Sequence, residues 1–231
     1  MSRLSQTLLR AGVDVAAPLR GSWRLPDASQ PPAPAPEAEM LRLYYAVQAL
    51  QAADRPIVVQ FVAAHAGAGT STLARGFAAA AAAECGRPVL LLSCDDGCGP
   101  APLARALRAG LPLAEATRAV PGSAHLRRAA LGPAAHPLQG MTAAEVGSLL
   151  DALRRECGVT VIDSPAASAA PDSLALSRFC DGTLLVVQAE ATPGSDVAAL
   201  KAEIERMGGQ VIGAVMNRRR RSGPAWLHAS R

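Results

Sequence analysis

Residues 58–76, VVQFVAAHAGAGTSTLARG, predict a buried strand, a glycine turn and the start of a helix. This arrangement can bind anions. Gly67 and Gly69 can adopt positive φ angles, which leave backbone N–H groups pointing into a concavity. Ser71 or Thr72 can cap a helix that begins there. Because free amides and the helix dipole converge at such a turn, the stretch can hold the phosphates of a ligand. A turn of small residues that binds no ligand would fit the same sequence.

Residues 64–71 match the phosphate-loop pattern G-x-x-x-x-G-K-[ST] in part. Gly69 and Ser71 stand at their expected positions, but Ala64 replaces the first glycine and Thr70 replaces the lysine. The lysine would supply a charge-assisted hydrogen bond to the phosphates, worth roughly 1.5 to 3 kcal/mol. Ser71 can still offer its hydroxyl to Mg²⁺. We therefore expect ATP or ADP and Mg²⁺ to bind weakly or not at all.

Two aspartates follow apolar stretches that are typical of buried strands. Asp95 comes after residues 89–92, and Asp163 comes directly after residues 159–162. Beside a phosphate loop, two carboxylates would position Mg²⁺ and could orient an attacking hydroxyl. Either aspartate alone could be a turn former. Both together, next to the loop, favour a metal site.

Short apolar strands alternate with helical patterns along the chain. We expect strands at residues 58–62, 89–92, 126–131, 159–162, 183–187 and 211–215, and helices at residues 37–53, 102–107, 141–156 and 195–207, after the glycine turn and from Asp172. This alternation predicts an α/β fold with a doubly wound, mostly parallel sheet and helices on both faces. Ligands bind such sheets at the carboxyl ends of the strands, where the aspartates are expected.

The composition predicts one α/β domain with disordered ends. Of the 231 residues, 50% are hydrophobic, enough for a sizeable core, and no stretch is as long as a membrane span or resembles a signal peptide. Five cysteines without zinc-ligand spacing suggest reduced thiols in a cytoplasmic protein. We expect a disordered Pro/Ala-rich arm over residues 1–36, a domain over residues 37–218 and a disordered basic tail over residues 219–231.

Several sequence blocks resemble a known family. They are VIDSP at residues 161–165, Asp172 with SLALSRF, CDGTLLVV at residues 180–187 and VIGAVMNR at residues 211–218. Together they look like the second half of the bacterial tyrosine kinases that act in capsule and exopolysaccharide synthesis. These kinases belong to the deviant phosphate-loop ATPases, alongside the ParA and MinD proteins. The resemblance spans residues 37–218 and implies their P-loop NTPase fold.

The resemblance also implies roles for individual residues. Asp163 holds the Walker B place, Asp95 holds the second acidic place of the Walker A' motif, and Asn217 sits where the family contacts adenine. In the E-x-x-R-x-x-R pattern that the family uses in ring assembly, Glu39 and Arg42 match the first two places. Tyr45 stands where the second arginine belongs.

The chain departs from the family at places that matter for catalysis. Thr70 replaces the lysine, Ser93 replaces the first Walker A' aspartate, and Ala68 replaces an acidic residue. His65, which we interpret as an ordinary loop histidine, lies where partition ATPases carry a second lysine. The tyrosine cluster that these kinases phosphorylate is missing, since the only two tyrosines are at positions 44 and 45. These departures argue jointly against autokinase activity.

The leading hypothesis is therefore a degenerate relative of these kinases that regulates or scaffolds exopolysaccharide or capsule synthesis and export, with impaired catalysis. Its vestigial nucleotide site would comprise Gly67, Ala68, Gly69, Thr70, Ser71, Thr72 and Asn217, with Ser71, Asp95 and Asp163 on the metal side. One alternative is an active ATPase or protein-tyrosine kinase that uses Asp95 and Asp163. Another is a positioning ATPase similar to ParA and MinD.

The tail carries most of the formal net charge of +4. Arg218, Arg219, Arg220 and Arg221 would be attracted to an anionic membrane, at about 1 kcal/mol per charge near such a surface, or would simply be solvated. Nucleic acid is a less suitable partner, because no aromatic residues interleave with the arginines. We expect a location at the inner face of the membrane. Expected partners are a polysaccharide co-polymerase, a kinase paralogue or further copies of this chain.

Overall fold

The computed structural model describes residues 36–50, 55–94, 102–132, 136 and 138–218. The expected arm up to residue 35, Asp95, and Arg219 to Arg221 of the tail lie outside the described residues. The expectations for them therefore stay predictions.

Seven strands form one sheet, in the order β3-β4-β2-β5-β1-β6-β7. The strands are β1 (Ile57–Val62), β2 (Val89–Ser93), β3 (Arg118–Ala119), β4 (Leu126–Ala130), β5 (Val159–Asp163), β6 (Gly182–Gln188) and β7 (Val211–Asn217). All neighbouring strands run parallel except β3, which is antiparallel to β4. The central strands are buried along their whole length, as expected for apolar strands covered on both faces. The predicted α/β fold with a mostly parallel sheet is confirmed.

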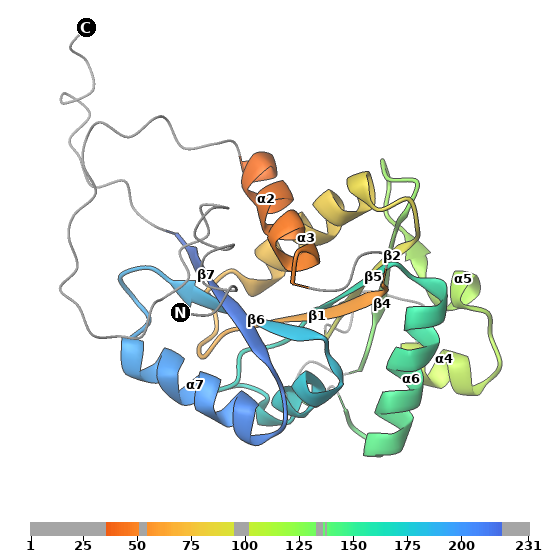
Figure 1. Ribbon diagram of the computed structural model, residues 1–231. Coiled ribbons are helices and arrows are strands. Elements are labelled where there is room, and N and C mark those ends of the chain that lie inside the picture. Colours follow the sequence, from red (N-terminus) through yellow and green to blue (C-terminus); the bar gives the residue numbers. More distant parts are fainter. Residues whose placement is uncertain (1–35, 51–54, 95–101, 133–135, 137, 219–231) are drawn as a thin grey trace, which may run out of the picture.

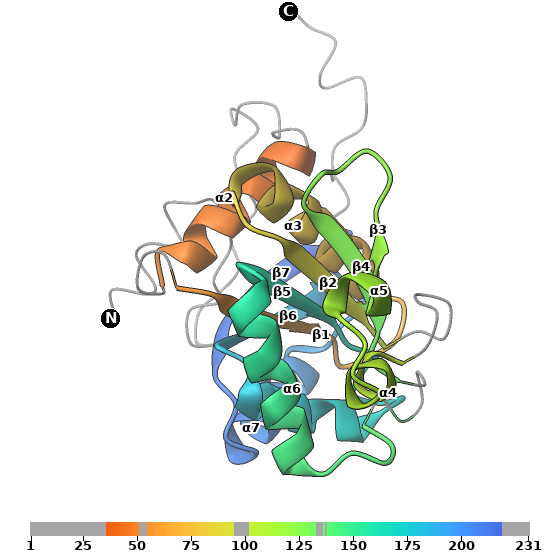
Figure 2. The same cartoon turned by 90° about the vertical axis from the view of Figure 1, so that its right-hand side faces the viewer.

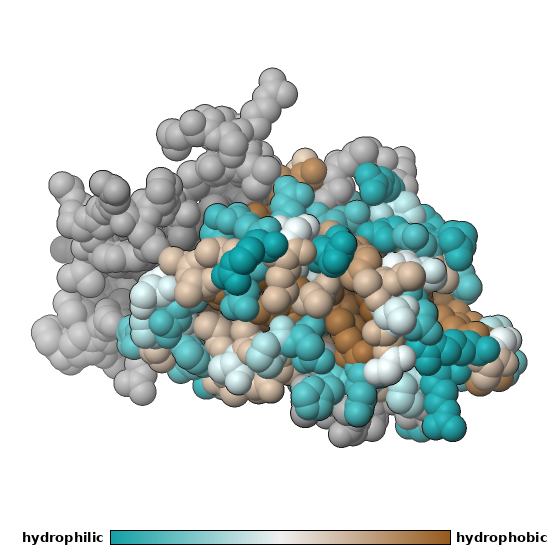
Figure 3. Space-filling model, turned by 90° about the horizontal axis from the view of Figure 1, so that it is seen from below, coloured by the Kyte–Doolittle hydropathy of each residue, from teal (hydrophilic) through white to brown (hydrophobic). Residues whose placement is uncertain are grey.

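Helices cover both faces of the sheet (Figure 1). They are α2 (Pro36–Gln48), α3 (Thr70–Glu84), α4 (Leu103–Arg108), α5 (Leu113–Ala116), α6 (Ala143–Glu156), η1 (Pro171–Phe179) and α7 (Gly194–Arg206). The helices α2 and α3 pack on one face, where Phe61 and Phe77 meet with ring centroids 5.3 Å apart. The others pack on the opposite face. Figure 3 shows the outer surface of the molecule from below, where hydrophilic and hydrophobic residues are mixed. No helix of the described residues is long and apolar enough to cross a membrane.

Three local features differ from expectation. The helix expected from Asp172 is a 3₁₀ helix, η1, which begins at Pro171. Strand β3 and helix α5 were not predicted, because one has two exposed residues and the other four residues in all. Helix α6 begins at Ala143, because the side chain of Thr142 accepts a hydrogen bond from the Glu145 N–H in a capping box.

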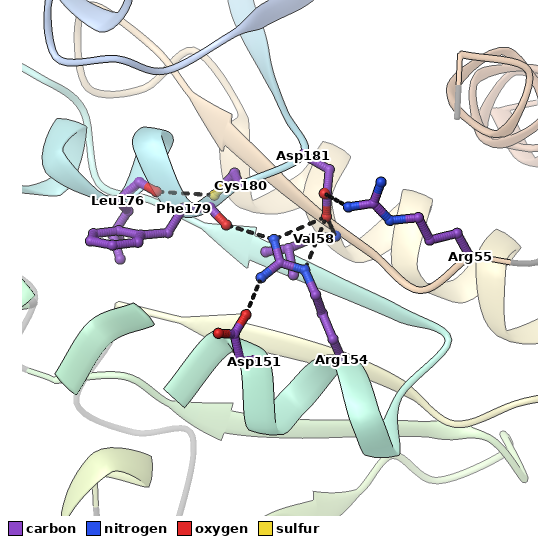
Figure 4. Close-up of polar contacts among 8 residues, drawn as sticks. All are labelled: Arg55, Val58, Asp151, Arg154, Leu176, Phe179, Cys180 and Asp181. Carbon is purple, nitrogen blue, oxygen red and sulfur yellow. Dashed lines mark hydrogen bonds and ion pairs between the residues drawn. The ribbon is translucent and has the colours of Figure 1, made fainter. Parts of the chain in front are cut away.

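A network of ion pairs and hydrogen bonds joins β1, β6 and α6 at the amino ends of the parallel strands (Figure 4). The carboxylate of Asp181 accepts hydrogen bonds from the Val58 N–H at 2.8 Å and from the Arg154 guanidinium at 3.2 and 3.4 Å. Arg55 adds a contact to the same carboxylate at 3.4 Å, and Arg154 also donates to the Phe179 carbonyl at 2.7 Å. The network fixes the start of β1, whose other end leads into the glycine turn.

Candidate functional site

The turn between β1 and α3 has the backbone shape that its glycines favour. Gly67 and Gly69 have φ angles of 83° and 91°, in the left-handed region. Helix α3 begins at Thr70 with Gly69 as its N-cap, and no side chain caps it. The expectation that Ser71 or Thr72 caps this helix was wrong, because both residues already lie within its first turn. Their hydroxyls are therefore not used for capping.

Asn217, at the end of β7, holds this turn in place. Its Nδ2 donates to the Ala68 carbonyl at 2.8 Å, and its Oδ1 accepts from the Arg218 N–H at 2.8 Å. A Cβ atom at Gly69 would lie 2.1 Å from the same Nδ2. Position 69 therefore needs glycine both for its φ angle and for the close approach of Asn217.

The structure brings Ser71 and Asp163 together. Phe61 near the end of β1 is in register with Asp163, the last residue of the neighbouring strand β5. Helix α3 then places the Ser71 hydroxyl 3.1 Å from Asp163 Oδ1, to which it donates a hydrogen bond. Asp163 is buried. A hydroxyl and a carboxylate beside a glycine turn are oxygen ligands of the kind that Mg²⁺ prefers.

Ser93, where the resemblance places an aspartate, ends β2 directly beside this carboxylate. It is buried and in register with Asp163. The next residue, Cys94, donates its backbone N–H to the Asp163 carbonyl at 3.2 Å. Burial, and secondarily the nearby carboxylates of Asp163 and Asp172, raise the pKa of the Cys94 thiol far above its usual range. The thiol therefore stays protonated and does not act as a nucleophile at neutral pH.

Sequence reasoning missed the partner of His65. His65 Nε2 lies 2.7 Å from Asp196 Oδ2, in the first turn of α7. This hydrogen bond is the main cause of a lowered pKa for the Asp196 carboxyl. His65 therefore ties the turn to α7, and its interpretation as an ordinary loop histidine omitted this contact. The two residues are 131 positions apart, so no local pattern could have found it.

A second missed residue is Gln60, buried in β1. Its Nε2 donates to Ser164 Oγ at 2.8 Å and to the Ser173 carbonyl at 3.0 Å, and its Oε1 accepts from Thr183 Oγ1 at 3.3 Å. These bonds fix the segment that follows Asp163. A lone glutamine in an apolar strand is the one signal that could have indicated a buried polar network.

Two buried polar atoms at the start of η1 have no hydrogen-bond partner among the described residues. They are Asp172 Oδ1 and Ser173 Oγ. Asp172 belongs to one of the blocks that resemble the kinase family. An unpaired buried polar atom is costly, so each one needs an explanation, such as a ligand or an ion that it contacts.

The residues of the expected ring-assembly pattern share the exposed side of α2. Glu39, Arg42 and Tyr45 follow one another at intervals of three, and all three are exposed. The Tyr45 hydroxyl donates a hydrogen bond to the Glu84 carboxylate at the end of α3. The position that departs from the pattern is thus used to attach α2 to α3.

Comparison with known proteins identifies the fold. No family model and no curated protein sequence matches the chain. Among solved structures, the chimerical protein CapA2B2 has a TM-score of 0.66 and 21% identity over 93% of this chain and 98% of its own. The kinase domain of the Escherichia coli tyrosine kinase ETK has a TM-score of 0.64 and 16% identity over 94% of this chain and 96% of its own.

The cell division protein MinD of Aquifex aeolicus is also similar, with a TM-score of 0.57 and 18% identity over 71% of this chain and 70% of its own. At these identities the likeness concerns the fold. The chain has the P-loop NTPase-like fold that bacterial tyrosine kinase domains share with the MinD ATPases.

Proposed function

We propose that this chain is a kinase-like P-loop protein of impaired catalysis that regulates or scaffolds exopolysaccharide or capsule synthesis and export. The main support for this proposal is a contrast in the turn of residues 67–71, which keeps the backbone shape of a phosphate loop but lacks its positive charge. The glycine conformations and the bond from Ser71 to Asp163 support an inherited nucleotide pocket. Thr70, however, offers no positive charge where the pattern has lysine, and the imidazole of His65 is bonded to Asp196.

The residues present fit a nucleotide with Mg²⁺ in their donor chemistry. A Cβ atom at Gly67 would meet no atom within 4 Å, so the turn has open space on that side. Ser71 and Asp163 would hold the metal ion, and the amides of residues 67–71 would receive the phosphates, because the Thr72 N–H already donates to the Gly69 carbonyl. Bound Mg²⁺ would neutralise part of the phosphate charge. Without lysine the turn supplies only dipoles and hydroxyls, which favours weak binding over turnover.

The polysaccharide part of the proposal rests on the sequence blocks that resemble the capsule and exopolysaccharide kinases. The missing tyrosine cluster supports a regulatory or scaffolding role rather than autophosphorylation. Suitable partners are a membrane polysaccharide co-polymerase, a kinase paralogue or further copies of the chain. The arginines at positions 218–221 would favour a location at the inner face of the membrane.

Calorimetric titration with Mg·ATP and with Mg·ADP tests this proposal. We expect weak or undetectable binding by the natural chain and no ATP turnover. Thr70→Lys should raise the affinity by roughly one to two decades, because it restores a charge-assisted hydrogen bond to the phosphates. Ala79→Lys is the matched control, since it adds the same charge to an exposed position of the same helix, outside the candidate site. Equal effects of the two variants would contradict the proposal.

The second candidate function is an active ATPase or tyrosine kinase that phosphorylates a partner. The specific observation in its favour is the bond between Ser71 and Asp163, which keeps the metal-side groups together. ATP turnover by the purified natural chain that Asp163→Ala abolishes would establish this candidate and overturn the first.

A further inference from the structure

The positive charge of the folded chain is concentrated on one side of the molecule. Residues 102–132, which form α4, α5, β3 and β4, contain five arginines and one acidic residue, Glu115. Figure 2 shows these elements together on the side that faces the viewer. In contrast, residues 182–217 contain four acidic residues and two basic ones. They include β7, which lies at the other end of the sheet.

Two of these arginines lie directly opposite each other. Arg118 of β3 is the cross-strand partner of Arg128 of β4, and both side chains are exposed. Like charges in such a pair destabilise a sheet. Within the part of the chain that the structure describes, neither guanidinium makes an ion pair or a side-chain hydrogen bond. Among the described residues, this hairpin therefore has two guanidiniums on one face that no carboxylate neutralises.

Arg127, the neighbour of Arg128 in β4 and the cross-strand partner of Ala119, behaves differently. Its guanidinium donates to the Ala114 carbonyl at 2.6 Å, to Thr117 Oγ1 at 2.6 Å and to the Thr117 carbonyl at 3.0 Å. Because successive side chains of a strand alternate, Arg127 projects from the opposite face and fastens α5 to β4. Arg127 thus has a structural role, whereas the described structure shows no such role for Arg118 or Arg128.

Strand β3 is the last strand of the sheet, so its outer edge has no partner strand among the described residues. The Val120 N–H donates to the Leu126 carbonyl at 2.9 Å, which makes these two a hydrogen-bonded pair. Pairs alternate along an antiparallel ladder. The N–H and C=O of Ala119 therefore point away from β4, where an added polypeptide strand could bond to them.

We propose that the β3–β4 hairpin binds an acidic segment of a partner polypeptide, which adds to β3 as an extended strand and places its carboxylates against Arg118 and Arg128. Arg118 and Arg128 are neighbours across the ladder and share one face of the hairpin. A strand added beside β3 would present every second side chain on that same face, so alternating carboxylates would all lie on the side of the two arginines. A bilayer would need a broad cationic surface and could not use the outward backbone groups of β3. Charged edge strands also protect against aggregation, but that protection does not require two like charges in register.

The test measures fluorescence anisotropy of a labelled synthetic peptide about ten residues long, with alternating glutamate and threonine, titrated with the full chain without nucleotide. We expect saturable binding that weakens with salt. Arg118→Glu should lower the affinity by at least about tenfold, because it removes one guanidinium and neutralises the other. The matched control, Arg206→Glu on α7, changes an exposed arginine on the acidic segment and should leave the affinity within about twofold.

Two further measurements keep the proposal falsifiable. Arg118→Glu should raise the melting temperature or leave it unchanged, since it replaces like charges with an ion pair, so lost binding would not reflect unfolding. A peptide of the same composition with its glutamates in adjacent pairs should bind more weakly, because its carboxylates lie on both faces of a strand.

Equal affinity for the two peptides, or binding unaffected by Arg118→Glu, would overturn the proposal. Tighter binding of phosphatidylserine vesicles or duplex DNA, weakened by the same substitution, would replace the polypeptide partner with a membrane or a nucleic acid. Because no nucleotide is present, none of these outcomes depends on whether the P-loop site functions.

Discussion

Polar groups at the amino ends of the strands have a different use from those at the carboxyl ends. At the amino ends, Asp181 is bonded to the start of β1 and to two arginines, so its charge holds separate elements together. At the carboxyl ends, the Ser71 hydroxyl bonds to Asp163 instead of capping α3, and Asp172 Oδ1 is buried without a hydrogen-bond partner among the described residues. The polar groups at the amino ends of the strands thus stabilise the fold, whereas those at the carboxyl ends include groups that a ligand could use.

The sharpest test of this difference is the removal of Asp181. Asp181→Ala should lower the free energy of unfolding by about 3 kcal/mol, because Arg154, with 23% of its side chain exposed, loses the buried one of its two carboxylate partners and the Val58 N–H loses its acceptor. Chemical denaturation measures the change. Asp151→Ala is the control, since the Asp151 side chain is 65% exposed and its pair with Arg154 should contribute about 1 kcal/mol or less. Equal losses in the two variants would remove the distinction.

Cys157, which lies just before β5 at the amino ends of the strands, should make the fold less stable at alkaline pH. Burial is the main cause that raises the pKa of its thiol from 9.0 to about 11. The unfolded chain therefore releases this proton first as pH rises, and stability falls between pH 9 and 11. Cys157 should contribute up to about 1.4 kcal/mol per pH unit to this fall. Denaturation curves across this range should show a smaller slope for Cys157→Ala, and an unchanged slope would contradict the prediction.

At the carboxyl ends of the strands, the residue that should tolerate substitution least is Gly69. Gly69→Ala should cost about 2 kcal/mol, because alanine disfavours a φ of 91° and its Cβ would displace the Asn217 amide. The second part of the cost should vanish in an Asn217→Ala background. A double-mutant cycle by thermal unfolding checks this coupling. Strictly additive effects would mean that Asn217 does not hold the turn.

The smallest effect on stability is expected from Ser71. Ser71→Ala removes one hydrogen bond to Asp163 and should change the free energy of unfolding by about 1 kcal/mol or less. Any dependence of nucleotide binding on Mg²⁺ should nevertheless disappear, as calorimetry with and without Mg²⁺ would show. A large stability loss with unchanged Mg²⁺ dependence would assign Ser71 to the fold rather than to the site.

The sequence predicts those parts of the structure that depend on local pattern. The six strands with apolar runs were all found, and the parallel topology predicts that Asp163 lies beside the glycine turn. The T-x-x-E pattern from Thr142 to Glu145 is a local signal for the start of α6, two residues later than the periodicity predicts. In contrast, β3 consists of two exposed residues, which carry no hydrophobic signal.

Long-range pairs explain most of what sequence reasoning missed. Asp181 lies 123 positions from Val58, and Asp196 lies 131 positions from His65, so neither contact leaves a local pattern. The cap of α3 was mistaken for a different reason. Hydroxyl residues are the usual N-caps, but the left-handed conformation of Gly69 ends the turn one residue before Thr70.

The position of Asn217 has a consequence for any purine that enters the pocket. Both ends of its amide are engaged, one by the Ala68 carbonyl and the other by the Arg218 N–H. A base that took the place of the Ala68 carbonyl would detach the turn from β7. The Asn217 side chain would then have to serve either the base or the glycine turn. Tighter recognition of the base would therefore leave the turn less well ordered for phosphate binding.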